Sequence, residues 1–258
     1  MLLAIDIGNT NIVIAIIDGK KIIKNWRIAT SHTRTEDEFW LTLKLLSEDA
    51  NVAMKDIDGV IISSVVPHLS SQFKSMTITH LNIEPIIVDH TLPLELKLAV
   101  DNPAEVGADR ICNAYAALKK YKLPQIIIDL GTATTYDVVS ENGEYLGGII
   151  SPGVEVSFRN LIKKTALLPK ISFKFPKNIV GSNTVDNLQS GITYGTVTQI
   201  DGLVKKIIKE KKWTDVSVIA TGGFAKYLEN KSETIEYIDN NLILDGMQMI
   251  YEKVSKTK

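Results

Sequence analysis

The sequence lacks the short motifs by which most nucleotide and metal sites are found. No glycine is followed by Lys and then Ser or Thr, so there is no P-loop, and no Gly-x-Gly-x-x-Gly occurs. The four histidines lack the spacing of metal ligands and are expected to be surface or structural residues. A phosphate or metal site in this chain must therefore use a different kind of turn.

Cysteine, net charge and long apolar runs are also scarce. Cys112 is the only cysteine, which excludes an intramolecular disulfide framework, fits a reducing compartment and favours a small buried residue at this position. The formal net charge of −1 argues against a nucleic-acid or membrane-surface role. No apolar run approaches a membrane span, and Asp6 interrupts the N-terminus before a signal segment develops. We expect a cytoplasmic soluble protein.

The sequence contains the same acidic-glycine turn motif at two places. Ile5-Asp6-Ile7-Gly8-Asn9-Thr10-Asn11 is echoed by Ile128-Asp129-Leu130-Gly131-Thr132-Ala133-Thr134. In each copy an apolar strand ends at an Asp, and a Gly permits a tight turn whose backbone N–H groups can point at phosphate oxygens while the Asp holds a cation. A strand that ends in an ordinary Asx-type turn gives the same pattern singly, but two copies favour nucleotide binding.

The repeat continues beyond the turn. Each copy runs into a second apolar strand that closes on Asp18-Gly19 or Asn142-Gly143, dipeptides whose two residues can both take positive φ in a hairpin turn. Third strands follow over 21–29 and 144–150. With 258 residues and 45% hydrophobic residues, the chain can form two domains, which we place at 1–122 and 123–258.

Helices and further strands alternate along the rest of both halves, which predicts a mixed α/β fold. Helices are expected from Thr35, after Pro67, over 106–121, from about Pro152, over 186–212 and over 242–254, and buried strands over 60–62, 86–88 and 216–220.

Two further segments are candidates for chemistry. Thr221-Gly222-Gly223 follows a strand, where an adenine or ribose could approach the backbone, although such turns often use Gly for structural reasons alone. Asn102, Pro103 and Glu105 form a good helix start, so that Asp109 lies early in the helix. Asp109 could simply complement the helix dipole, but Gly107 costs about 1 kcal/mol in a helix unless something must come close.

Five motifs occur in one order: Asp-x-Gly-Asn-Thr at 6–10, Gly-Ala-Asp-Arg at 107–110, Asp-Leu-Gly-Thr-Ala-Thr-Thr at 129–135, Gly-Gly-x-Ile-Ser-Pro-Gly at 147–153 and Thr-Gly-Gly at 221–223. This set resembles the type III pantothenate kinases over nearly the whole chain. The resemblance implies two actin-like (ribonuclease H-like) domains, with mixed β-sheets flanked by helices and an active site in the cleft between them. It also implies a cytoplasmic homodimer that phosphorylates pantothenate with ATP to 4′-phosphopantothenate, the first step of coenzyme A biosynthesis.

The resemblance assigns roles to positions of this chain. ATP contacts fall on Asp6, Ile7, Gly8, Asn9, Thr10, Asn11, Ile12, Val13 and Thr132. Asp109 matches the catalytic base, and Gly107, Ala108, Asp109, Arg110 and Thr184 match pantothenate contacts. Asp129 matches the ligand of a monovalent cation, potassium or ammonium, and Asp6 is the carboxylate we expect to hold Mg²⁺. Val100 stands where many family members have Tyr, which puts one substrate contact in doubt.

Two other interpretations of the function remain open. A non-catalytic regulatory or accessory homologue could keep the fold, although the retained Asp6, Asp109, Arg110 and Asp129 argue against a pure scaffold. A kinase for another small alcohol could use the same fold, since fold does not fix the substrate.

Overall fold

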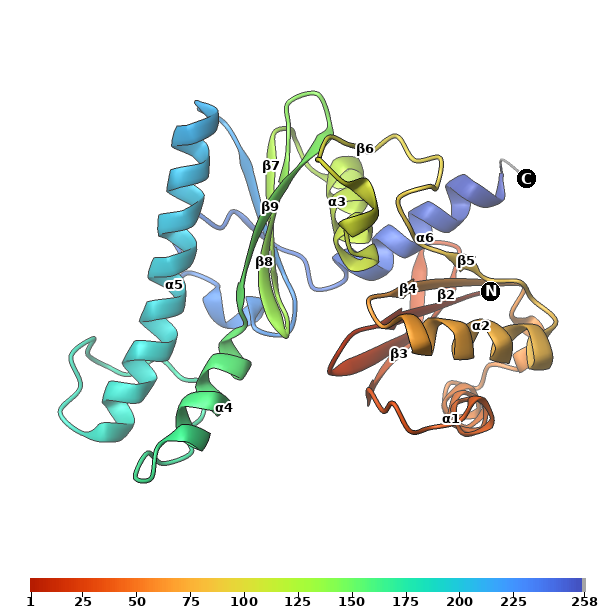
Figure 1. Cartoon of the computed structure of the whole chain (residues 1–258), viewed down its shortest axis with the longest axis horizontal. Helices are drawn as coiled ribbons and strands as arrows, with labels where there is room; N and C mark the ends of the chain where they lie inside the picture. Colours follow the sequence, from red (N-terminus) through yellow and green to blue (C-terminus); the bar gives the residue numbers. More distant parts are fainter. Residues whose placement is uncertain (257–258) are drawn as a thin grey trace. The chain divides into compact units, whose positions relative to one another are not determined.

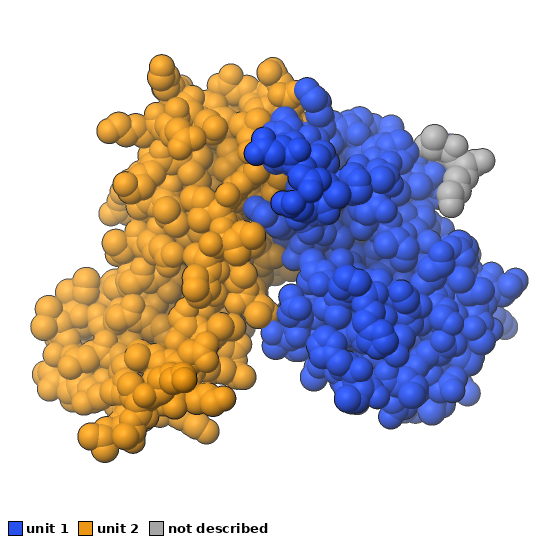
Figure 2. Space-filling view, viewed as in Figure 1, with its two compact units in different colours: residues 1–120, 241–258 blue, residues 121–240 orange. Residues whose placement is uncertain are grey.

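The computed structural model describes residues 1–256 and divides into two compact units (Figure 2). Unit 1 comprises Met1–Lys120 and the segment that begins at Asn241; unit 2 comprises Tyr121–Asn240. Unit 1 contains β1 (Leu2–Ile7), β2 (Asn11–Asp18), β3 (Lys21–Ala29), α1 (Glu36–Asp49), the 3₁₀ helix η1 (Met54–Asp56), β4 (Gly59–Ser64), α2 (Pro67–Leu81), β5 (Ile86–Ile87), β6 (Lys97–Leu98), η2 (Pro103–Glu105), α3 (Ala108–Lys120) and α6 (Leu242–Ser255). Unit 2 contains β7 (Gln125–Leu130), β8 (Ala133–Val139), β9 (Glu144–Pro152), α4 (Val154–Lys164), α5 (Thr184–Lys211), β10 (Ser217–Thr221), η3 (Ala225–Leu228) and β11 (Tyr237–Ile238).

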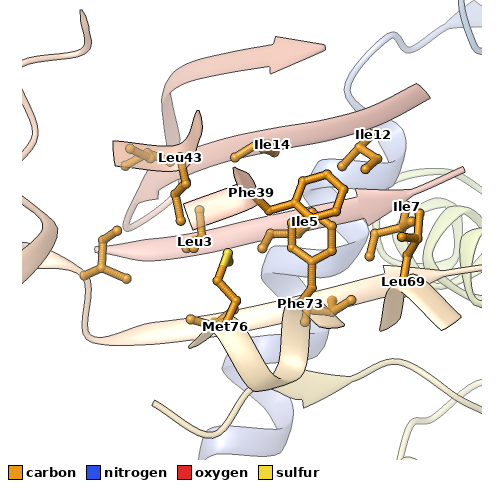
Figure 3. Close-up of a cluster of buried hydrophobic side chains, with 14 of the residues drawn as sticks. Leu3, Ile5, Ile7, Ile12, Ile14, Phe39, Leu43, Leu69, Phe73 and Met76 are labelled. Carbon is orange, nitrogen blue, oxygen red and sulfur yellow. The ribbon is translucent and has the colours of Figure 1, made fainter. Parts of the chain in front are cut away.

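The sheet of unit 1 has the strand order β3-β2-β1-β4-β5. β1 pairs antiparallel with β2 and parallel with β4, so it lies at the centre of the sheet. Side chains alternate between the faces of a strand, and Leu3, Ile5 and Ile7 of β1 all join the core beneath α1 and α2. The rings of Phe39 and Phe73 lie 4.5 Å apart in this core, beside the strand that carries Ile5 (Figure 3).

The opposite face of the same sheet is covered by α3 and α6 (Figure 1). Both helices contact β4, and α6 also contacts β1. By the same alternation, Ala4 and Asp6 of β1 project toward this second face, and Ala4 is fully buried there. Asp6 therefore points to the side of the sheet on which α3 carries Asp109.

The position of α6 differs from the domain division expected from the sequence. We placed 123–258 in one C-terminal domain, whereas the compact units group the last helix with the N-terminal residues. The reason is tight packing against α3: a Cβ at Gly246 would collide with the backbone carbonyl of Cys112. This contact spans more than half the chain, and no local pattern in the sequence indicates it.

Unit 2 repeats the sheet of unit 1. Its strands lie in the order β11-β10-β7-β8-β9, with antiparallel pairs between β7, β8 and β9 and parallel pairs from β7 to β10 and from β10 to β11. The sheet of unit 1 has the same sequence of pair types from β3 to β5. α5 runs along one face of the unit 2 sheet (Figure 1), and its Val197, Ile200 and Val204 enter the core. The predicted duplication and mixed α/β fold are confirmed.

The two predicted hairpins are also present, but the turn residues act differently from our expectation. In the first hairpin Asp18 pairs with Lys21, so the loop is Gly19-Lys20, and only Gly19 takes positive φ. In the second, the N–H of Gly143 donates to the carbonyl of Ser140 at 2.9 Å, and Gly143 alone has positive φ. The glycine absorbs the unusual backbone conformation in each case, so the preceding Asp or Asn does not need to adopt it.

The observed helices begin a few residues from the limits predicted from the sequence. Asn102 caps the separate 3₁₀ turn η2, so α3 begins at Ala108 instead of continuing from the predicted start near 106. α5 begins at Thr184 rather than Asp186, because the side chain of Asn183 accepts a hydrogen bond from the Asp186 N–H and caps the helix. α5 stays continuous through its three glycines because its buried face packs on the sheet. Among the described residues, no helix has both the length and the apolar character to cross a membrane.

Candidate active site

The first acidic-glycine turn follows β1 and is held by three hydrogen bonds. The N–H of Gly8 donates to the carbonyl of Asn11 at 3.0 Å. Thr30, which directly follows β3, forms the other two hydrogen bonds. Its hydroxyl donates to the Gly8 carbonyl at 2.6 Å, and its N–H donates to the Thr10 carbonyl at 3.0 Å. Asn9, Thr10 and Asn11 are exposed. A fixed, solvent-facing backbone is what phosphate binding by turn amides requires. The sequence pattern did not identify Thr30.

Asp6 has a buried partner that the sequence pattern also missed. The hydroxyl of Ser63, which is fully buried on β4, donates to Oδ1 of Asp6 at 2.9 Å. The two residues lie opposite each other in the parallel pair of β1 and β4. The signal in the sequence is slight: Ser63 follows the apolar strand 60–62 and resembles any strand-ending serine.

Asp109 lies in the first turn of α3, as predicted, and its carboxylate folds back over the residue before the helix. Oδ1 of Asp109 accepts a hydrogen bond from the backbone N–H of Arg110 at 2.8 Å. A Cβ added at Gly107 would lie 2.5 Å from this oxygen and 3.4 Å from Cγ1 of Val65. The group that must come close to Gly107 is therefore the Asp109 carboxylate itself, together with Val65.

Burial raises the pKa of Asp109 above its ordinary value, while the backbone N–H and the guanidinium of Arg110 act in the opposite direction. A carboxylate with a raised pKa is a stronger proton acceptor than one in water. Asp109 thus combines an early-helix position with the basicity that a general base needs.

Cys112 shows that Asp6 and Asp109 lie in one neighbourhood of unit 1. The thiol is fully buried, which raises its pKa well above the ordinary value, and the charges of Asp6 and Asp109 raise it further. A hydrogen bond between Cys112 and Ser63 lowers it. The end of β1, the end of β4 and the start of α3 therefore converge around this cysteine, which is the small buried residue we expected.

The raised pKa of Asp109 predicts a displaced pH profile. Activity should rise with pH as Asp109 loses its proton, with a midpoint above the ordinary Asp value of 3.8, because burial disfavours the charged form. The measurement is kcat/KM between about pH 4 and 8. A profile without an acidic limb in this range would contradict the assignment of Asp109 as the base.

The second acidic-glycine turn, after β7, is held by a different set of contacts. The N–H of Gly131 donates to the carbonyl of Ala133 at 3.0 Å, and the N–H of Gly153 donates to the carbonyl of Thr132 at 3.2 Å. A Cβ at Gly153 would lie 2.5 Å from the carbonyl oxygen of Gly131. The start of α4 therefore packs directly on this turn, which explains the glycine that ends the motif at 147–153. Thr132 is exposed.

Asp129 is the next-to-last residue of β7 and lies beside Gly222. A Cβ at Gly222 would lie 2.5 Å from Oδ1 of Asp129 and 2.8 Å from the backbone of Leu130, and Gly222 has φ +90°. Asp129 also lies opposite Thr221 in the parallel pair of β7 and β10. We expected a glycine here because an adenine or ribose could approach the backbone. The structure gives another reason for a glycine at position 222, which is that it leaves room for the Asp129 carboxylate.

The remaining predicted positions lie outside these two groups. Val100 is half-buried between β6 and η2, and Thr184 is the exposed first residue of α5. A cavity of about 730 Å³ in unit 2 is lined by residues of α4, by 170–173, by Ile192 and by Phe224. None of these lining residues is a predicted site residue.

The carboxylates present fit a magnesium ion that is held mainly by its nucleotide. Within residues 1–256, no group of three or more His, Cys, Asp or Glu side chains is arranged to hold a metal ion. Mg²⁺ in kinases is bound by one or two carboxylates together with phosphate oxygens and waters, so Asp6 at the end of β1 suits this role.

The chain is similar to known proteins along most of its length. A family model described as type III pantothenate kinase matches residues 2–206. A type III pantothenate kinase of Halalkalibacterium halodurans is 44% identical over 253 residues, which cover 98% of this chain and 99% of the relative. Another, from Exiguobacterium sibiricum, is 46% identical over 253 residues with the same coverage of each chain.

The chain belongs to the type III pantothenate kinase family. This membership confirms the predicted family and enzyme class, and a kinase of this family uses ATP with a divalent metal ion.

Solved structures support the fold of the family. The ROK hexokinase of Thermus thermophilus matches with a TM-score of 0.52 at 12% identity, over 98% of this chain and 99% of that one. A Campylobacter jejuni protein described as a Baf family transcriptional activator matches with a TM-score of 0.61 at 22% identity, again over 98% and 99%. At these identities the likeness concerns the fold alone.

Proposed function

We propose that the chain transfers the γ-phosphoryl group of ATP to the primary hydroxyl of pantothenate, forming 4′-phosphopantothenate in the first step of coenzyme A biosynthesis. The family match over 2–206 supports the substrate and the reaction. The observation that carries the proposal within the structure is the Asp109 carboxylate, half-buried at the start of α3 and given room by Gly107. We infer a cytoplasmic location from the same family resemblance.

In this proposal Asp109 accepts the proton of the pantothenate hydroxyl as its oxygen attacks the γ-phosphorus in line. Because the transition state of phosphoryl transfer is loose, placement and charge neutralisation supply most of the acceleration. Gly107, Ala108 and Arg110 surround the base and contact pantothenate, with Val100 and Thr184 as further substrate contacts. Val100 replaces the aromatic side chain of many relatives with a smaller apolar one, so this contact is weaker.

The ATP contacts are proposed for 6–13 and for Thr132. The first turn is fixed by its hydrogen bonds and is exposed at Asn9, Thr10 and Asn11, which suits backbone N–H groups that bind phosphate oxygens. Thr132 in the second turn is exposed as well, so its hydroxyl is accessible to a phosphate. Mg²⁺ held at Asp6 would neutralise charge on the β- and γ-phosphates. Thr30 keeps the turn in shape without itself being assigned a phosphate contact.

The decisive experiment is an acceptor screen with ATP. We expect phosphorylation of pantothenate far above that of sugars, acetate and other small alcohols, measured by nucleoside diphosphate release and mass spectrometry of the product. Phosphorylation of a different acceptor would favour the rival small-alcohol kinase. No phosphorylation of any acceptor, with the protein folded, would favour the non-catalytic accessory homologue.

We propose that Asp129 binds a potassium or ammonium ion, since its carboxylate oxygen is held close to Gly131 and Gly222 by the turn. On this proposal, activity in sodium-only buffer should be about tenfold lower than in potassium or ammonium buffer. Asp129→Asn should remove most of this difference. Equal rates of the wild-type protein in sodium and potassium would contradict the assignment.

We also propose a homodimer as the active form. Support comes from the family resemblance and from exposed apolar side chains in unit 2, including Leu167 at 94% exposure and Val180 at 82%. On dilution, the activity per chain should fall in parallel with the dimer fraction measured by light scattering. Constant activity per chain across dissociation would show that the monomer is sufficient.

A further inference from the structure

Ser63 is a buried hydroxyl to which the proposed reaction assigns no step. It is fully buried at the end of β4, and its Oγ lies 2.9 Å from Oδ1 of Asp6. Because an ionised carboxylate can only accept hydrogen bonds, the hydroxyl proton of Ser63 must point to Asp6. A bond of this kind to a charged group, inside the protein, is among the stronger ones.

Ser63 lies in a closed environment next to Cys112 of α3. Both residues are fully buried, and Cys112 is close to Ser63 and to Asp6. Because water does not reach the Ser63 side chain, it does not compete for the hydrogen bond between Ser63 and Asp6.

The backbone around Ser63 and Asp6 is closely packed. Cys112 lies one helical turn after Asp109 on α3, and α6 packs against the Cys112 backbone at Gly246, where no side chain would fit. Ser63 is placed opposite Asp6 by the parallel register between β1 and β4. The same helix thus carries the proposed base and the buried residue that packs beside Ser63.

We propose that Ser63 is a positioning residue that fixes the Asp6 carboxylate for the metal–nucleotide complex. A fixed carboxylate does not need to be ordered when the metal binds, so less binding energy is lost. This inference rests on the proposed function, because it takes Asp6 as the carboxylate that meets Mg²⁺. The second unit has a related arrangement, in which Thr221 lies opposite Asp129 on the parallel neighbour of β7.

The test measures binding of a non-hydrolysable ATP analogue by calorimetry across a series of Mg²⁺ concentrations. For Ser63→Ala we expect about tenfold weaker binding of the magnesium complex and a higher half-saturating Mg²⁺ concentration, because the carboxylate loses the buried hydroxyl that donates to it at 2.9 Å. Binding of the analogue without metal should change by less than about twofold, since the turn amides are untouched. Ser63→Thr keeps the hydroxyl and should restore magnesium-dependent binding.

Ser64→Ala is the matched control. Ser64 is the next residue, and its hydroxyl forms hydrogen bonds with the backbone of Val66, which precedes α2. This variant can lose stability, yet its magnesium dependence should equal that of the wild type. Ser63→Cys preserves the side-chain volume with a weaker donor and should bind the magnesium complex about threefold more weakly, which keeps the test valid if Ser63→Ala does not fold.

Asp6→Asn separates this inference from the proposed function. If Asp6→Asn weakens magnesium-dependent binding while Ser63→Ala and Ser63→Cys bind like the wild type, the positioning role is wrong and the proposed function stands. If the wild type and Asp6→Asn bind the magnesium complex equally, the assignment of Asp6 itself is wrong and the inference fails with it.

Discussion

Asp109→Asn is expected to lower kcat by about 10² to 10⁴-fold, because an amide cannot accept the proton of the attacking hydroxyl. The substitution is nearly isosteric, and the amide oxygen can still accept the Arg110 N–H bond that Asp109 makes at 2.8 Å. Binding of ATP should therefore be preserved. Steady-state kinetics with pantothenate, together with calorimetric ATP binding, provide the measurement.

The same variant should be more stable than the wild type at neutral pH. Burial raises the pKa of Asp109 in the folded protein, so its contribution to stability is present below the unfolded pKa and is lost as pH rises through the folded value. Asparagine has no charge to bury. Asp37→Asn is a suitable control, because Asp37 is an exposed acid of unit 1. Turnover of Asp109→Asn near that of the control would remove Asp109 from its role.

Gly222→Ala is expected to destabilise the protein by about 2–4 kcal/mol, since it combines backbone strain with overpacking. Gly222 has φ +90°, and the added Cβ would lie 2.8 Å from the backbone of Leu130. It would also lie 2.5 Å from Oδ1 of Asp129, so the carboxylate must move. We expect a lower thermal midpoint and a loss of the potassium response.

Gly202→Ala is the control for this variant, because it adds the same methyl group within the same unit. Gly202 lies inside α5, and nothing is within 4 Å of its added Cβ. Alanine there should stabilise the protein by about 0.5–1 kcal/mol through its higher helix propensity. If Gly222→Ala matched this control in thermal stability and cation response, the close approach of Asp129 to Gly222 would have no consequence.

The parts of the fold that the sequence predicted are those with local causes. The repeated Asp and Gly residues, followed by apolar strands and Gly-containing hairpins, indicated two copies of one sheet, and the structure has them. α1 begins after Thr35, where a helix was expected, and Thr35 and Glu38 form a capping box there. In each case the residues that determine the structure are within a few positions of one another.

The parts that escaped prediction depend on pairing between distant segments. Ser63 reaches Asp6 across 57 positions because β4 pairs with β1, and no local pattern distinguishes it from another strand-ending serine. The place of α6 depends on the fit of Gly246 against Cys112. For the site, the sequence identified the charged groups, whereas the side chains that hold them became visible only with strand register and helix packing.

The return of α6 to unit 1 has a consequence for the order in which the chain can fold during its synthesis. Unit 2 is contiguous, so all of its residues have been synthesised before α6 is made. The sheet that carries Asp6 must wait for the last helix to cover one of its faces. The N-terminal half of the enzyme, although translated first, is therefore the half that is completed last.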